Sequence, residues 1–112
     1  MSNVRALAAE TLYNVVDKGA SLNQELPFAS QGLSPKDKAL LQQICYGVLR
    51  YLPSLENYCQ QLLDQPLKGK RRIFQFLLYV GIYQLQHMRV PHHAAISETV
   101  NALQQMRALG LK

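Results

Sequence analysis

Apolar residues are densest between residues 73 and 88, where they fall on nearly every face of a helix. A helix that is apolar all round must be covered on all sides, and this run is too short and too interrupted by glutamine to cross a bilayer. We therefore predict that it is the central helix of a globular core. Gly81 lies inside the run at a cost of about 1 kcal/mol relative to alanine, so we expect a neighbouring backbone to approach closely there.

Four further segments have the three- and four-residue apolar spacing of amphipathic helices: residues 4–18, 35–52, 55–65 and 95–109. The first three of these segments are each preceded by a residue suited to cap a helix at its amino end: Asn3, Ser34 and Ser54. Pro35 suits the first helical position of the second segment. Pro53 should end the second of these helices. We expect the second and third to be antiparallel neighbours joined by a corner of one or two residues.

Residues 20–33 combine apolar positions with proline and glycine, which predicts a short helical turn followed by a loop. No stretch alternates with period two over the length of a strand. The predicted fold class is therefore all-α, with about five main helices around a central apolar helix. At 112 residues, one domain spanning 1–112 is the natural organisation.

The positive charge is concentrated just before the central helix, at Lys68, Lys70, Arg71 and Arg72. The net charge of the chain is +5, and removing these four residues would leave +1 (5 − 4). They crowd a helix start, where the dipole already favours anions, which argues for a local anion site. The alternative is a solvated cluster that keeps an apolar helix soluble.

Cys45 and Cys59 are the only cysteines, and both fall on apolar helix faces. Two buried free thiols in a reducing cytosol explain them better than a disulfide or a metal pair. The amino terminus lacks the pattern of a secretory signal, so we expect a cytoplasmic protein without membrane contact.

No catalytic or metal site is predicted. His92 and His93 are adjacent, so on a helix they diverge by about 100 degrees and do not share a metal easily. The chain has no phosphate-cradling glycine loop and no glycine-flanked serine. Glu98 either braces the preceding turn or is a surface carboxylate. The tyrosines, Tyr46 and Tyr51 among them, either stack on bases or belong to the core.

Two long stretches, residues 36–50 (KDKALLQQICYGVLR) and 68–104 (KGKRRIFQFLLYVGIYQLQHMRVPHHAAISETVNALQ), resemble the NusB-like helical domain. The likeness is specifically to the copy at the amino end of bacterial ribosomal RNA cytosine methyltransferases of the RsmB (Sun/Fmu) type. It covers essentially the whole chain. Free-standing NusB, a transcription antitermination factor, shares the second stretch more closely than the first.

This resemblance implies an RNA-binding accessory domain whose partners are ribosomal RNA and a methyltransferase domain carboxy-terminal to it in the parent chain. The parent would transfer a methyl group from S-adenosylmethionine to carbon five of a cytosine in small-subunit ribosomal RNA. The methyltransferase domain is absent from this chain, so we expect no cofactor and no enzyme activity in this chain alone. Cys45 and Cys59 match no catalytic motif of it.

Two departures from the family pattern matter. The arginine-rich amino-terminal arm of NusB proteins is reduced here to Arg5, and the family continues past Lys112 with another helix. We therefore expect a fragment of a longer protein. Its central and last helices would then carry bare apolar surface, which favours self-association.

The predicted RNA contacts are Lys68, Lys70, Arg71 and Arg72, with Arg5 and Arg50 as weaker candidates. Two alternatives stay open. In one, the chain is a protein-docking module whose basic cluster faces an acidic partner. In the other, it is a free-standing antitermination factor.

Overall fold

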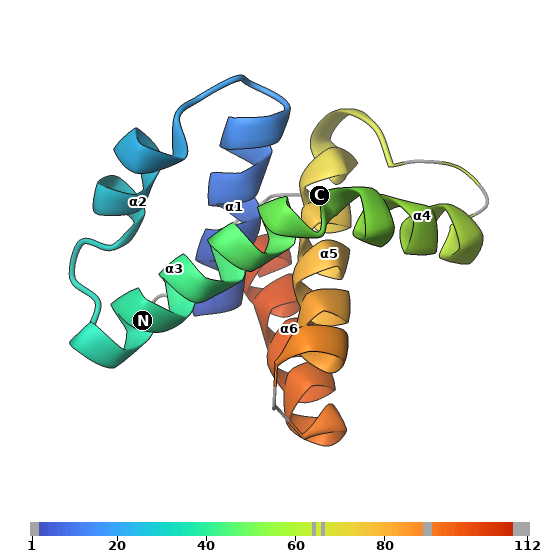
Figure 1. Cartoon of the computed structure of the whole chain (residues 1–112). Coiled ribbons are helices and arrows are strands. Elements are labelled where there is room, and N and C mark those ends of the chain that lie inside the picture. The colour runs from blue at the N-terminus through green and yellow to red at the C-terminus, as the bar shows by residue number, and fades with distance from the viewer. Residues whose placement is uncertain (1–2, 64, 66, 89–90, 109–112) are drawn as a thin grey trace.

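Six α-helices and one turn of 3-10 helix make up the part of the chain that the computed structural model describes, residues 3–63, 65, 67–88 and 91–108 (Figure 1). The elements are α1 (Val4–Val16), α2 (Leu22–Ala29), α3 (Pro35–Arg50), α4 (Leu52–Leu62), η1 (Gly69–Arg71), α5 (Arg72–His87) and α6 (His92–Ala108). The described residues contain no strand, which confirms the all-α class. Five helices correspond to the predicted main helices, and α2 is the short helical segment expected within residues 20–33.

Two helix starts form as their sequences predict. The Asn3 side chain accepts hydrogen bonds from the backbone N–H groups of Arg5 and Ala6, at 2.9 and 3.2 Å. Ser34 Oγ accepts one from the N–H of Asp37 at 3.2 Å, and Pro35 opens the helix. Each cap satisfies amides that the first helical turn leaves without partners.

The junction of α3 and α4 differs from the prediction. Tyr51 alone joins the two helices, and Pro53 lies in the first turn of α4 instead of ending α3. Ser54 is therefore inside the helix and is not its cap. Tyr51 has φ −103° and ψ 16°, which bends the chain without reversing it. The predicted antiparallel pair is wrong: α4 runs onward from α3 and packs mainly against α5 (Figure 1).

The central position predicted for residues 73–88 is confirmed, because α5 contacts α1, α3, α4 and α6 (Figure 1). Its side chains Phe76, Tyr79 and Val80 are almost completely buried, together with Leu12 of α1 and Leu41 of α3. Burial of these large apolar side chains supplies most of the stabilisation of such a domain, at about 1.5–3 kcal/mol for each.

One face of α5 is left uncovered by the other helices of the described part of the chain. Leu78, Ile82 and Leu85 of α5 line a groove with Ile96 and Val100 of α6, which we call the apolar groove. Leu85, Ile96 and Val100 are 37%, 56% and 45% exposed. The prediction that the central helix is covered on all sides is therefore wrong for this face. The bare surface agrees with the other expectation, of exposed apolar area on the central and last helices.

Close packing at glycine occurs at a different position from the one predicted. A β-carbon at Gly81 would lie 3.4 Å from the side chain of Thr99, which is ordinary contact with a side chain and not with a backbone. A β-carbon at Gly47 of α3 would instead overlap the phenol ring of Tyr83. Gly47 is therefore the glycine whose missing side chain makes room for a ring from a neighbouring helix, α5.

Candidate nucleic-acid interface

The end of α1 meets the start of α5, and an ion pair fastens them. Arg72 donates from Nε to Asp17 Oδ2 at 2.8 Å and from Nη2 to Asp17 Oδ1 at 3.2 Å. The two side chains are 23% and 27% exposed. The hydrogen bond with Asp17 is the main reason that the pKa of Arg72 lies above its ordinary value. One of the four predicted phosphate ligands is thus already bound to a carboxylate.

Aromatic rings connect the same two helix ends. The Arg72 guanidinium carbon lies 4.9 Å from the centre of the Phe76 ring, and Tyr13 packs edge-on against Phe76 with ring centres 6.0 Å apart. The Lys18 ammonium lies 5.4 Å from the centre of the Tyr13 ring. These contacts bring Lys18, which follows α1, to the start of α5.

Three side chains at this end, Lys18, Lys68 and Arg71, are exposed, and we call them the basic tip. None of the three is paired with a carboxylate among the residues that the structure describes. Lys70 belongs to η1 between the other two, and its side chain lies outside the described part. Sequence reasoning missed Lys18 because it is remote along the chain; its only signal is its place at the end of an amphipathic helix.

The backbone at the basic tip also favours an anion. Gly69 has φ +61°, a left-handed conformation suited to glycine, and η1 leads directly into α5. Among the residues that the structure describes, no side chain caps η1 or α5. The first amides of this helical segment therefore add their partial positive charge to that of the lysine and arginine side chains.

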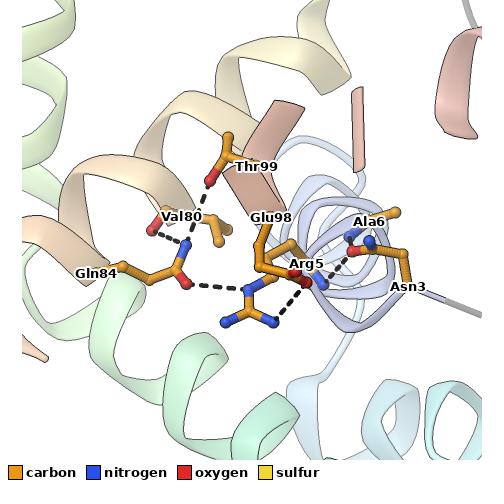
Figure 2. A network of polar contacts seen from close by, with 7 residues as sticks. All are labelled: Asn3, Arg5, Ala6, Val80, Gln84, Glu98 and Thr99. Atoms are coloured by element: carbon orange, nitrogen blue, oxygen red, sulfur yellow. Dashed lines mark hydrogen bonds and ion pairs between the residues drawn. The ribbon is translucent and has the colours of Figure 1, made fainter. Parts of the chain in front are cut away.

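Arg5 is used inside the fold (Figure 2). Its Nε donates to Gln84 Oε1 at 3.0 Å, and its Nη1 lies 3.6 Å from Glu98 Oε2. Only 13% of its side chain is exposed. Arg5 is therefore a structural cation that joins α1 to α5 and α6, and little of it is open to a phosphate.

Gln84 is the centre of this polar network, and it is completely buried. Its Nε2 donates to the Val80 carbonyl at 3.2 Å and to Thr99 Oγ1 at 3.4 Å, while its Oε1 accepts from Arg5 (Figure 2). Glu98 therefore braces α6 against α1 through Arg5. The network satisfies every polar group that Gln84 brings into the core, as buried amides require.

Arg50 ends α3 and is exposed, but it lies in a different place from the basic tip. Its guanidinium carbon is 5.6 Å from the centre of the Tyr51 ring. Together with Tyr83 and His87 these residues line a groove between the carboxy-terminal ends of α3 and α5. The six predicted RNA ligands thus do not form one cluster.

The two cysteines are free and buried, as predicted. Burial raises the pKa of Cys45 to about 12 and that of Cys59 to about 11. A thiol with so high a pKa supplies almost no thiolate near neutral pH, so neither cysteine is suited to act as a nucleophile.

His92 and His93 are exposed in the first turn of α6. Within the described ranges, no three histidine, cysteine, aspartate or glutamate side chains converge as a metal site would require. No helix there has the length and apolar character needed to cross a membrane. The preceding turn includes residues 89 and 90, which lie outside the described residues.

Comparison with known proteins identifies relatives of this chain. A sequence model of the NusB family matches residues 2–110. Over 110 residues the chain is 56% identical to ribosomal RNA small subunit methyltransferase B of Vibrio vulnificus, with 98% of this chain and 26% of the relative covered. The corresponding proteins of Vibrio cholerae and Proteus mirabilis are 56% and 50% identical over 98% of the chain. The chain therefore spans about a quarter of the length of these curated relatives.

Proposed function

The chain belongs to the NusB family, and we propose that it is the RNA-binding accessory domain of a small-subunit ribosomal RNA cytosine methyltransferase. Residues 1–112 would form one NusB-like domain that works in the cytoplasm. It would hold ribosomal RNA in position for a methyltransferase domain of the same parent protein, where S-adenosylmethionine would bind. The similarity to named ribosomal RNA methyltransferases over 98% of the chain is the observation that carries this proposal.

The basic tip supports contact with a phosphate backbone. Lys18, Lys68 and Arg71 are exposed, and within the described residues no side chain caps the helical segment that Lys68 precedes. Lys70 lies between Lys68 and Arg71 in the sequence. Such groups bind phosphates irrespective of base, so they would position the RNA and leave the choice of target nucleotide to the catalytic domain. Arg72 and Arg5 are secondary contributors in this proposal, because carboxylates already neutralise their charge.

The test is the salt dependence of RNA binding by the double variant Lys68→Ala/Arg71→Ala. Each phosphate contact contributes about 0.7 to the slope of log affinity against log salt for a single strand. We expect the slope to fall by about 1.4 and the affinity at low salt to fall with it. Fluorescence anisotropy with a labelled ribosomal RNA fragment at several salt concentrations measures both quantities.

A matched control is available at the start of α3, where Lys36 and Lys38 are also exposed. Lys36→Ala/Lys38→Ala removes the same charge from a part of the surface away from the basic tip (Figure 1). This control should leave the slope close to that of the unaltered chain. Equal loss in the two double variants would mean that only net charge matters, and the basic tip would not be the binding surface.

A second candidate function, docking onto another protein domain, is favoured by one observation, the apolar groove between α5 and α6. Exposed apolar area of this kind marks interaction surfaces. Under this alternative, the separately produced methyltransferase domain would bind the chain, and Ile96→Ser/Val100→Ser would weaken that binding. Analytical ultracentrifugation of the chain alone would show whether the same surface causes self-association.

A further inference from the structure

The groove at the carboxy-terminal ends of α3 and α5 differs in chemistry from the basic tip. It has a volume of about 330 Å³ and is lined by Gln43, Tyr46, Arg50, Tyr51, Tyr83 and His87. We call it the aromatic groove. Its lining combines one cation, one amide and four rings, and none of these groups is used by the polar network around Gln84.

Three rings pack against one another along one wall of the aromatic groove. Tyr51 and His87 stack with ring centres 3.9 Å apart and an angle of 6° between their planes. The Tyr83 ring centre lies 5.6 Å from that of His87 and 6.3 Å from that of Tyr51. Tyr83 is 6% exposed and fits against α3 only because Gly47 has no side chain. The absence of a side chain at Gly47 thereby sets the position of the Tyr83 ring at the floor of the groove.

The rim of the aromatic groove is open to solvent. Tyr46 is 46% exposed, and its hydroxyl donates to Asn23 Oδ1 of α2 at 3.4 Å. Arg50, Gln43 and His87 are exposed as well. No carboxylate is paired with Arg50 among the described residues, in contrast to Arg5 and Arg72. The Tyr46 hydroxyl bonds to Asn23 and the Arg50 guanidinium lies over the Tyr51 ring, but both side chains remain open to solvent at the rim.

We propose that the aromatic groove binds one unpaired nucleotide of single-stranded RNA. The base would stack on the exposed rings of Tyr46 and His87, and the adjoining phosphate would bind to Arg50. Gln43 offers both a donor and an acceptor to the edge of the base. A paired base has both faces covered within a duplex, so only an unpaired one can stack on protein rings.

This site adds a separate contact to the surface in the proposed function, and it rests on that function because both need RNA. The 16 residues of α5 separate the two sites by about 24 Å at about 1.5 Å per residue. A single strand that crosses α5 would bring phosphates to the basic tip and one base to the aromatic groove. The two contacts are chemically different, so they can be tested separately.

The experiment uses a short single-stranded RNA that carries the fluorescent base 2-aminopurine, titrated with the whole 112-residue chain. Stacking on protein rings should quench its fluorescence, and the same RNA without the base at that position should bind more weakly. From the usual contribution of one stacked base, we expect Tyr46→Ala to weaken binding by about tenfold and to remove most of the quenching. Arg50→Gln should lower the salt slope without removing the quenching.

Tyr58→Ala is the matched control, because Tyr58 is 42% exposed on α4 and does not line the groove. It should leave both affinity and quenching unchanged. If Tyr46→Ala and Tyr58→Ala bind equally well and the base-free RNA binds like the intact one, the aromatic groove is not a nucleotide site. The proposed function survives that result. If the chain binds no RNA at all, the proposed function and the nucleotide site are both wrong.

Discussion

The two ends of α5 present different surfaces. Its start lies in the basic tip, where exposed cations surround an arginine already bound by Asp17 and rings such as Phe76 are buried. Its end lies in the aromatic groove, where one arginine is unpaired and several rings reach the solvent. The first surface suits the phosphates of a polyanion, and the second suits a planar base.

The comparison shows that charge in a sequence is not the same as charge available to a ligand. Arg72 and Arg50 both lie at the ends of helices, and the sequence predicts both as RNA ligands. Asp17, distant along the chain, neutralises the first, whereas no carboxylate pairs with the second among the described residues. The most useful variants therefore alter one end of α5 and leave the other intact.

The largest effect is expected at the aromatic end, from Gly47→Ala. The added methyl group would overlap the ring of Tyr83, so the helices must separate or the ring must leave its position. Overpacking of this kind should lower the free energy of unfolding by about 3 kcal/mol and disrupt the aromatic groove. Urea denaturation measures the stability, and 2-aminopurine quenching reports on the groove.

Gly81→Ala is the control for this prediction. A β-carbon there makes ordinary contact with Thr99, and alanine is the better helix former by about 1 kcal/mol. We expect the free energy of unfolding to be unchanged or slightly raised. The aromatic groove should quench 2-aminopurine as it does in the unaltered chain. Similar losses from the two glycine variants would show that the contact between Gly47 and Tyr83 is unimportant.

An intermediate effect is expected between the two ends, from Gln84→Leu. The change would leave the Arg5 Nε donor without its partner and would break the link to Thr99. Loss of a buried partner of a charged donor should cost about 2 kcal/mol of unfolding free energy. Gln86→Leu, an exposed neighbour on the same helix, should cost almost nothing. Thermal denaturation should give a lower midpoint temperature for Gln84→Leu than for Gln86→Leu. Equal midpoint temperatures would contradict this account.

The smallest effect on stability is expected at the charged end, from Asp17→Asn. The pair with Arg72 is partly exposed, so its loss should cost less than about 1 kcal/mol. The freed guanidinium should then add a phosphate contact, which raises RNA affinity by about threefold and steepens the salt slope. Anisotropy titrations at two salt concentrations would detect this change. Weaker RNA binding by Asp17→Asn would mean that the ion pair holds the basic tip in its binding conformation. Its main effect would then not be to neutralise the charge of Arg72.

Local patterns predicted much of this fold. The dense apolar run at residues 73–88 became the central helix, and the caps at Asn3 and Ser34 formed because they need only neighbouring amides. The predicted start of α4 was three residues too late, because Pro53 is as acceptable in the first turn of a helix as after its end. The direction of α4 depends on the conformation of a single residue, Tyr51, which no periodic pattern encodes.

Residue types and their spacing were enough to predict the all-α class, the central helix, the buried thiols and the family, because each of these depends on local pattern along the chain. Three features are visible only in the folded chain: Asp17 binds Arg72, Arg5 joins three helices through Gln84 and Glu98, and Lys18 belongs to the basic tip. The folded chain also shows that Gly47, and not Gly81, is the glycine whose place for a β-carbon is taken by a ring of a neighbouring helix. These contacts join residues far apart along the chain, and their geometry exists only once the helices have packed.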